Sequence, residues 1–387
     1  MSTRRILAAL LLLTLFAGCQ KKEGGSVSIK PRNSYLDASA GSVFVEVKAT
    51  LAWTITLEYP AGTEAWASIE PESGEGSKSD IRLRYQANAD AEPRTVTLVL
   101  NGQGASARAE VTQDGTGGGI EGQYGYDVAP PSLRWLELPA MEAGDGRELL
   151  VHNMEGGKYR GQARGDKRNW SCYWDFKEHM SLWVAYPHNK ALIGSGSRTN
   201  EWGVYDPCIP AAMQPNMAFT YGDGWNRGHQ IPSADRYTRA ANISTFYPTN
   251  MTPQNGAFNA GIWADLENRV RYYAGNVIDT LYVVTGALFD DSVVTTPSKT
   301  GFAVKIPTHY FKALLAHTKT YGQDGYLAAG YFFPHTGSIA AGKYRDYICS
   351  IDELEQKTGI DFFPNLIKVI GQEKADKVEA EAPGNWW

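Results

Sequence analysis

Residues 225–236 read WNRGHQIPSADR, and this stretch decides how we interpret the second half of the 387-residue chain. It describes a turn or strand that carries a histidine beside an arginine. Residues 246–255 follow with FYPTNMTPQN, and residues 258–267 with FNAGIWADLE. From there, apolar residues recur at helical spacing on one face: Ile262, Leu266, Val270 and Tyr273. The pattern predicts a helix over residues 259–274 that opens with asparagine.

The residue types in these stretches suit the cleavage of phosphodiester bonds. A neutral imidazole such as His229 can accept a proton near neutral pH. The side-chain oxygen of Asn259 suits a hard cation such as Mg²⁺, which keeps most of its waters and takes few protein ligands. Arg227 offers a planar fork to a phosphate. Each residue alone has a plainer interpretation, because an asparagine at a helix start is commonly just the N-cap.

In this order, the motifs resemble those of the DNA/RNA non-specific endonucleases, the ββα-metal nucleases that include mitochondrial endonuclease G. The likeness spans most of residues 165–366. It is carried by three groups of residues: Arg227-Gly228-His229, Asn250-Met251-Thr252-Pro253-Gln254, and Asn259 with Trp263, Leu266 and Glu267. The resemblance implies an α+β fold for residues 125–387, a ββα-metal nuclease domain with a mixed, largely antiparallel sheet flanked by helices.

The resemblance also implies roles for single residues. His229 corresponds to the general base that activates water. Asn259 corresponds to the direct ligand of one Mg²⁺, for which Mn²⁺ could substitute, and Glu267 to a residue that holds a metal-bound water. Arg227 and, in a looser alignment, Arg198 correspond to phosphate-binding arginines.

Three further positions complete the implied site. Asn250 and Gln254 correspond to residues that brace it. Asn226 departs from the family pattern, which has aspartate there, so we expect retained activity with an altered rate or metal affinity. Arg236 and Arg239 are candidates to extend the phosphate-binding surface, although exposed arginines are common. Contacts to phosphate carry no base sequence, so the implied substrates are DNA and RNA without sequence preference.

The N-terminus predicts export. Arg4 and Arg5 precede an apolar stretch over residues 6–17 that is shorter than the ~20 residues of a membrane span. Small residues directly before Cys19 resemble a lipobox, which implies a signal peptide over residues 1–18, lipidation of Cys19, and a polar tether over residues 19–26. We therefore predict an exported, membrane-anchored lipoprotein that lies in the periplasm or on the cell surface. The alternative is an ordinary secretory peptide with an incidental cysteine.

Residues 27–114 predict an all-β, immunoglobulin-like sandwich. Residues 42–48 and 95–100 alternate apolar and polar side chains, a turn cluster occupies residues 71–76, and Trp53 and Trp66 are the expected large core residues. Ala52-Trp53-Thr54-Ile55 and the closing Val111-Thr112-Gln113 resemble the BACON modules, which implies glycan binding. A plain spacer is the alternative. A glycine-rich linker follows over residues 115–124.

Charge and cysteine usage narrow the possibilities. The net charge of −5 and pI of about 5.9 are not those of a protein that binds nucleic acid by overall charge, so positive charge must be concentrated locally. Without a CxxC pair, a structural zinc site is not expected. In an exported protein we predict a Cys172–Cys208 disulfide and a buried free thiol at Cys349. The histidines other than His229, among them His152, show no ligand spacing.

Two other functions compete with an active nuclease. One is a glycan-binding surface lipoprotein whose nuclease-like domain is inactive, an interpretation that Asn226 and the acidic charge favour. The other is an enzyme of the same fold that acts on a different phosphoester. For the rest of the larger domain we predict strands over residues 281–285 and 326–333. We also predict a helix over residues 350–358 that begins at Ser350, three residues before Glu353.

Overall fold

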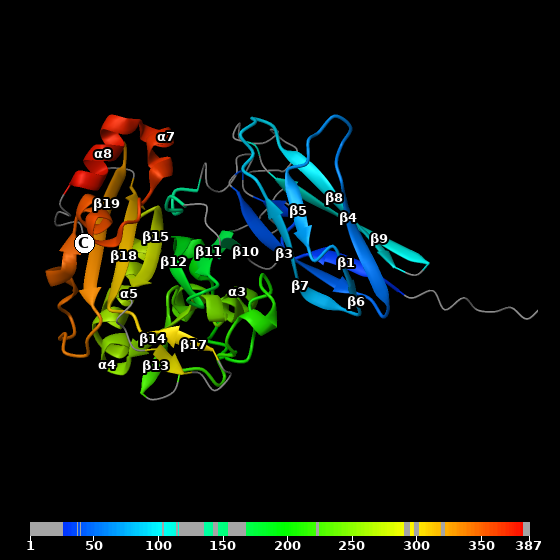
Figure 1. Cartoon of the computed structure of the whole chain (residues 1–387). Helices are drawn as coiled ribbons and strands as arrows, with labels where there is room; N and C mark the ends of the chain where they lie inside the picture. The colour runs from blue at the N-terminus through cyan, green and yellow to red at the C-terminus, as the bar shows by residue number, and fades with distance from the viewer. Residues whose placement is uncertain are drawn as a thin grey trace, which may run out of the picture.

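The computed structural model describes residues 26–36, 38, 40–102, 104–113, 115, 135–141, 146–153, 168–221, 224–289, 295–297, 302–318 and 322–381. They form an N-terminal sandwich and a larger α+β part that lie side by side (Figure 1). The predicted signal peptide, Cys19 and nearly all of the predicted linker fall outside the described residues. Within the described residues, no helix combines the length and the apolar character that crossing a membrane requires.

The sandwich consists of two sheets whose facing sides enclose one apolar core. Trp53 and Trp66 are both buried in that core, as expected. The turn cluster was only partly right, because three of its residues form a short strand that pairs with the strand of Trp53. The first sheet has the order β1 (Ser28–Pro31), β3 (Gly41–Lys48), β7 (Lys78–Tyr85) and β5 (Ala67–Glu70). The second has the order β2 (Tyr35–Leu36), β9 (Ala105–Gln113), β8 (Arg94–Gly102), β4 (Ala52–Glu58) and β6 (Ser73–Glu75).

A seven-stranded sheet, in which every pair of neighbours is antiparallel, forms the centre of the larger part. It contains the strands predicted around residues 281–285 and 326–333. Its central strands are buried on both faces, which explains their continuous apolar runs. The order is β10 (Arg147–Asn153), β11 (Arg168–Asp175), β12 (Met180–His188), β15 (Thr280–Leu288), β18 (His309–His317), β19 (Tyr326–Pro334) and β20 (Ile348–Cys349).

Each face of this sheet packs against different elements. One face holds the core that includes Leu266 and Val270 of helix α5 (Ala264–Asn276) and Ile262 of the turn that precedes it. The opposite face packs against α6 (Ile351–Thr358) and α8 (Gln372–Ala380), with α7 (Ile367–Ile370) between them in sequence. The predicted cap of α6 is present, because the Ser350 side chain and the Glu353 backbone and carboxylate form a reciprocal capping box.

Several of the remaining elements are short. They comprise the helices α2 (Lys190–Ile193) and α3 (Arg239–Ser244), the hairpin of β16 (Thr295–Pro297) and β17 (Ala303–Lys305), and the 3₁₀ turns η1 (Ala211–Met213), η5 (Tyr344–Tyr347) and η6 (Pro364–Leu366).

The sandwich docks directly on edge strand β10 of the large sheet (Figure 1). Phe44 of β3 is fully buried and belongs to the apolar core of the larger part. The guanidinium of Arg82 lies 4.0 Å from the ring centroid of Phe44 and 4.8 Å from that of Phe176, and it forms an ion pair with Glu148 at 3.8 Å. The two parts therefore share one buried interface.

Candidate active site

A two-stranded hairpin presents the histidine of the deciding stretch. Strands β13 (Trp225–His229) and β14 (Met251–Asn255) pair antiparallel, with His229 opposite Met251 and Arg227 opposite Pro253. The connection between them contains η2 (Ser233–Asp235), α3 and η3 (Pro248–Asn250). The chain continues directly from β14 into a helix, so two strands and a helix lie together in the order that the resemblance implied.

The helix after β14 starts earlier than predicted. Its N-cap is Asn255, whose side-chain oxygen accepts hydrogen bonds from the backbone N–H groups of Ala257 at 2.9 Å and Phe258 at 3.2 Å. Helix α4 (Gly256–Phe258) leads into a wide π-type turn, η4 (Asn259–Trp263), and then into α5. Asn259 is therefore not needed as a cap, because the preceding asparagine already fills that role. Such wide turns frequently occur at functional sites.

His229 is buried, with one ring nitrogen uncommitted. Its ring forms edge-to-face contacts with Trp202 and Phe246 at centroid distances of 5.6 and 5.2 Å. The ring is hydrogen-bonded to the backbone of Arg227, whereas Nε2 has no partner among the described residues. Burial, followed by the positive charge of Arg198, lowers the pKa of His229 to about 3. The imidazole is therefore neutral, and Nε2 is available to accept a proton.

A surface hollow of about 420 Å³ brings together four of the predicted residues: Arg198, Asn226, Arg227 and Asn259. Aromatic walls hold the two arginines in it. The Arg227 guanidinium lies 4.0 Å from the ring centroid of Trp202 and donates a hydrogen bond to the carbonyl oxygen of Met217 at 2.7 Å. Arg198 lies 5.0 Å from the ring centroid of Phe246. A larger hollow of about 1580 Å³ elsewhere contains none of the predicted residues.

Glu267 lies on α5, two turns beyond Asn259, and is partly buried. Burial raises the pKa of its carboxyl group, and the nearby Lys312 and Arg198 oppose that shift. Lys312 of β18 is fully buried, with its Nζ 4.6 Å from the ring centroid of Trp263, and burial lowers its pKa. Sequence reasoning missed this lysine. The available signal was a single cation inside the apolar strand HYFKALLAH.

The two predicted bracing residues are buried in the hairpin region. The Asn250 side chain accepts a hydrogen bond from the Ile231 N–H at 2.9 Å and donates to the carbonyl oxygens of Ile231 and Thr245 at 3.0 and 2.8 Å. Gln254 packs so closely on β13 that a Cβ on Gly228 would lie 2.2 Å from its Cδ. These side chains fix the connection between the two strands.

Arg236 does not line a phosphate-binding surface, because its side chain is fully buried. It donates hydrogen bonds to Asn169 Oδ1 and to the carbonyl oxygens of Asn169 and Pro187, each at 2.8 Å. Its neighbour Asp235 accepts a 2.6 Å hydrogen bond from Arg271 Nε of α5. Arg239 is exposed and lies 3.5 Å from Glu201. The Asp235–Arg236 pair thus joins η2 to the large sheet and to α5, which is a structural role.

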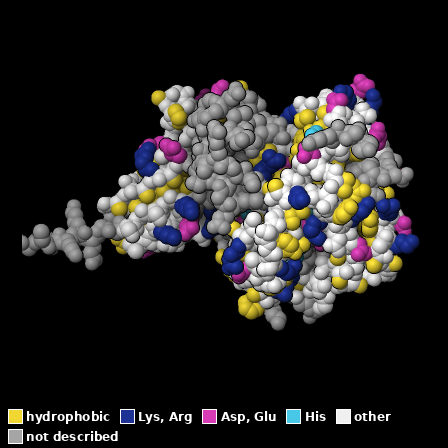
Figure 2. Space-filling view, turned by 180° about the vertical axis from the view of Figure 1, so that it is seen from behind, with side chains coloured by type: hydrophobic (Ala, Val, Ile, Leu, Met, Phe, Trp, Pro, Cys, Tyr) yellow, Lys and Arg dark blue, Asp and Glu magenta, His cyan; other side chains and the backbone are white. Residues whose placement is uncertain are grey.

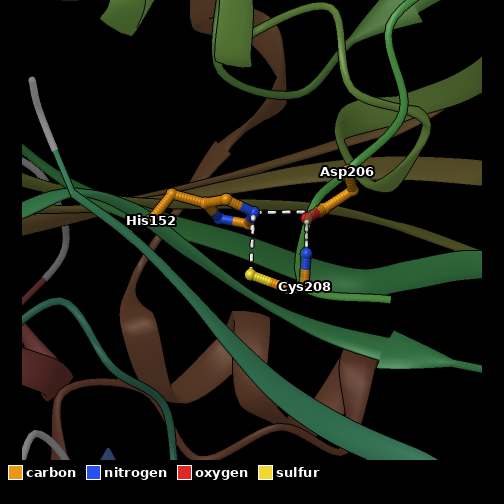
Figure 3. A group of neighbouring side chains, drawn as sticks. All are labelled: His152, Asp206 and Cys208. Carbon is orange, nitrogen blue, oxygen red and sulfur yellow. Dashed lines mark hydrogen bonds and ion pairs between the residues drawn. The ribbon is translucent and has the colours of Figure 1, made fainter. Parts of the chain in front are cut away.

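The predicted Cys172–Cys208 disulfide is not formed, because both cysteines, like Cys349, are free thiols. The Cys208 sulfur lies instead 3.8 Å from His152 Nε2, and the same nitrogen lies 2.8 Å from Asp206 Oδ2 (Figure 3). Sequence reasoning treated His152 as background, since its partners are more than fifty residues away in the chain. This trio contains none of the residues predicted for catalysis.

On one face of the molecule, basic residues are dispersed among other side chains (Figure 2). On the face shown in Figure 2, lysine and arginine side chains stand in small groups among acidic and apolar ones. This agrees with the acidic pI. The pair Arg198 and Arg227 in the hollow supplies positive charge locally, as the sequence required.

Comparisons with known proteins agree with this arrangement. Residues 160–368 match the family model of the DNA/RNA non-specific endonucleases, and residues 26–116 match that of the viral BACON domain. A mitochondrial EXOG nuclease from Danio rerio is 29% identical over 204 residues, which cover 50% of this chain and 59% of that protein. Nuclease C1 from Cunninghamella echinulata is 30% identical, covering 42% of this chain and 66% of that protein. A nuclease from Nostoc sp. is 28% identical, covering 55% and 77%.

The matched segment thus spans little more than half the length of the EXOG relatives. A solved EndoG/EndoGI inhibitor complex contains a chain with a TM-score of 0.43 and 20% identity, covering 53% of this chain and 85% of that one. The family model covers more than half of the present chain, and its residues include the whole β13–β14 hairpin and the helix that follows. The chain belongs to the DNA/RNA non-specific endonuclease family.

Proposed function

We propose that the protein is a metal-dependent endonuclease that hydrolyses phosphodiester bonds of DNA and RNA without sequence preference. The observation that carries this proposal is a division among the polar side chains around the hairpin. Asn250, Asp235 and Arg236 are fully engaged in hydrogen bonds within the protein. His229 Nε2 is buried and has no partner among the described residues, and the amide of Gln254 on the paired strand is likewise left without one. A group that is left uncommitted at such a cost in desolvation is expected to serve function.

Two of the predicted residues fit a magnesium ion. Asn259 and Glu267 both carry oxygen donors, and neither side chain is hydrogen-bonded to another described residue. Mg²⁺ prefers such hard oxygen ligands and takes few of them from the protein. Asn259 would bind the ion directly and Glu267 through a water, and Mn²⁺ could replace it. When bound, the ion would polarise the phosphate and stabilise the charge on the leaving oxygen.

The chain's own residues would accept the proton from water and offset the negative charge on the phosphate. His229 Nε2 accepts a proton from the attacking water, and its hydrogen bond to the Arg227 backbone holds the ring in position. Arg198 and Arg227 bind the scissile phosphate and offset the negative charge that grows during attack. Because Trp202 and Phe246 hold these cations in place, little reorganisation is needed when substrate arrives.

The expected substrate range follows from the same contacts. Arginines that grip phosphate oxygens do not read base edges, so they do not select a sequence. An open hollow lined by Arg198 and Arg227 can accept any polynucleotide backbone, with or without a 2′-hydroxyl group. We therefore infer activity on both DNA and RNA.

The test is digestion of plasmid DNA and of RNA by the full chain in Mg²⁺, with and without EDTA. We expect both substrates to be degraded, EDTA to stop the reaction, and His229→Ala to lower the rate by about 10²–10⁴-fold, the usual contribution of a general base. His317→Gln, a change at a half-exposed histidine paired with Asp279, is the matched control and should cut normally. Full activity of folded His229→Ala would refute the assignment of the base.

We also propose export and lipid anchoring through Cys19. The support is the sequence of residues 1–19 alone. Expression in a bacterial host should label the chain with radioactive palmitate and place it in the membrane fraction. Cys19→Ala should lose both the label and the membrane association, and labelling that survives this change would disprove the proposal.

A further inference from the structure

Three ligand-type side chains from separate parts of the chain meet at the edge of the large sheet. His152 comes from β10, whereas Asp206 and Cys208 come from the loop before η1. Their ligand atoms all lie within 4.8 Å of one another. Figure 3 shows the imidazole, the carboxylate and the thiol pointing toward one point. No other described residues form such a group of three histidine, cysteine or acidic side chains.

The arrangement is not that of a catalytic triad. In a nucleophilic triad the histidine uses one ring nitrogen for the nucleophile and the other for the acid. Here His152 Nε2 faces both partners, at 2.8 Å from Asp206 Oδ2 and 3.8 Å from Cys208 Sγ. A single nitrogen that faces a carboxylate and a thiol together has the geometry of metal coordination.

Two of the three ligand–ligand distances are near those of a tetrahedral zinc site, and the sulfur of Cys208 lies within 4.8 Å of the Asp206 carboxylate. Zinc bonds of about 2.0–2.3 Å to nitrogen, oxygen and sulfur place the ligand atoms roughly 3.3–3.6 Å apart. The nitrogen–sulfur distance of 3.8 Å nearly meets this value. The nitrogen–oxygen distance of 2.8 Å, now that of a hydrogen bond, would have to open by about half an ångström.

Neighbouring groups hold two of the ligands in place. The His152 ring stacks on Trp170 with a centroid distance of 3.7 Å, which fixes its plane. The backbone N–H of Cys208 donates to Asp206 Oδ1 at 2.8 Å, and the Thr249 hydroxyl donates to Asp206 Oδ2. Outer partners of this kind orient the ligands of metal sites.

We propose that His152, Asp206 and Cys208 bind a zinc ion, with the fourth position taken by water. A thiolate with an imidazole selects zinc over magnesium, so this site differs in chemistry from the proposed catalytic one. Binding replaces the His152–Asp206 hydrogen bond with bonds from Nε2 and Oδ2 to the metal, so the ring proton moves from Nε2 to Nδ1. The Cys208 thiol releases its proton to solvent as it becomes a thiolate ligand. The sequence concealed the site because the ligands do not follow the CxxC spacing of common zinc motifs.

The position of the site suggests what the ion does. Arg32 of the sandwich donates a 2.7 Å hydrogen bond to the carbonyl oxygen of Pro207, the residue between two of the ligands. His152 lies on β10, the strand on which the sandwich docks. The ion would therefore fasten the loop of residues 206–208 to β10 at the junction between the two parts of the molecule.

The test is metal analysis of the full chain, with no dependence on nuclease activity. After dialysis against zinc and then against magnesium buffer, we expect one zinc ion per chain. Replacement by Co²⁺ should give a thiolate-to-cobalt charge-transfer band, which a site made of oxygen and imidazole ligands cannot produce. Zinc should also raise the Tm of the wild-type chain.

Cys208→Ser is the informative variant, since it keeps the volume and polarity of the side chain. It should lose the charge-transfer band and the zinc-dependent rise in Tm, whereas Cys349→Ser, at a buried thiol on the sheet, should keep both. A wild-type chain that retains no zinc, or a band that persists in folded Cys208→Ser, would overturn the proposal. Because His229 and Asn259 are unchanged in these variants, failure of the zinc proposal would not count against the proposed nuclease activity.

Discussion

The side chain of Gln254 occupies the space that a Cβ on Gly228 would need. The two residues lie on the paired strands β13 and β14, and an added Cβ would meet Gln254 Oε1 at 2.4 Å. Gly228 separates Arg227 from His229, so the close packing of these strands sets the positions of both proposed catalytic side chains. Glycine is required here for close approach, since its φ is not in the left-handed region.

Gly228→Ala should therefore weaken both the fold and the site. Overpacking of this kind costs about 1–3 kcal/mol of unfolding free energy. Displacement of His229 should mainly lower kcat and change KM less. Urea unfolding and plasmid cleavage would measure the two effects. The double variant Gly228→Ala/Gln254→Ala should recover part of each. A Gly228→Ala protein with wild-type stability would contradict this account of the packing.

Asn226→Asp should restore the residue type that the family pattern carries at this position. Asn226 is exposed and lines the hollow with Arg227 and Asn259, so a carboxylate there brings negative charge toward the proposed ion. We expect tighter Mg²⁺ binding at low salt and a change in stability within about 0.5 kcal/mol, as for most surface substitutions. Magnesium titrations of cleavage give the readout. Weaker magnesium dependence in the aspartate variant would argue against an ion in this hollow.

Arg227→Gln and Arg236→Gln should have opposite consequences. Arg227 lines the hollow and donates a hydrogen bond to the carbonyl oxygen of Met217, so its loss should reduce cleavage and leave Tm nearly unchanged. Arg236 is fully buried, so its removal leaves several buried acceptors unpaired and should cost about 3 kcal/mol or more. Thermal unfolding and cleavage of both variants provide the comparison. Equal losses of activity at equal stability would mean that Arg236 reaches the substrate after all.

The pH dependence should separate the base from the metal site. The lowered pKa of His229, about 3, keeps the imidazole neutral well below pH 6.5. The raised pKa of Glu267 means that its carboxylate gains a proton as pH falls toward the acid range, which weakens magnesium binding. At saturating Mg²⁺, kcat should therefore persist below pH 6, while the apparent Kd for Mg²⁺ rises. In Glu267→Gln the Kd should be weaker and should depend less on pH. A drop in kcat centred near pH 6.5 at saturating magnesium would contradict the lowered pKa of His229.

Lys312→Met offers an independent check on the same carboxylate. The change keeps an unbranched side chain against Trp263 and removes the positive charge that opposes the raised pKa of Glu267. The pKa of Glu267 should rise further, so the loss of magnesium affinity should begin at higher pH than in the wild type. An unchanged pH profile of the magnesium Kd would show that the two groups do not interact.

Local patterns were sufficient to predict much of this fold. Period-two alternation located β3 and β8, and the apolar spacing of Ile262, Leu266 and Val270 identified the buried face of η4 and α5, because each pattern reflects a side that faces a core. The helix start was misplaced by three residues, since two asparagines, Asn255 and Asn259, were both plausible caps. Only the backbone reveals which side chain turns back onto the N–H groups.

Properties that depend on distant segments were not predictable. Arg236 is buried because its guanidinium donates hydrogen bonds to Asn169 and Pro187, which are distant from it in the sequence. Lys312 gains its significance from Glu267 of another element. The expectation of a disulfide rested on turn-rich sequence around Cys172 and Cys208, but both thiols are free, and the sulfur of Cys208 lies 3.8 Å from His152 Nε2. Pairing of this kind is determined by topology.

The burial of Phe44 in the nuclease core has a mechanical consequence. If the two parts were joined only by a flexible linker, the larger part could take many orientations relative to the sandwich. Because Phe44 is buried in the core of the larger part and lies beneath Arg82, we expect the sandwich to restrict the orientation of the hollow relative to strand β1. If the N-terminus is anchored to a membrane surface, the hollow cannot swing toward a distant substrate. The nucleic acids that are cut would then be those flexible enough to bend toward the enzyme.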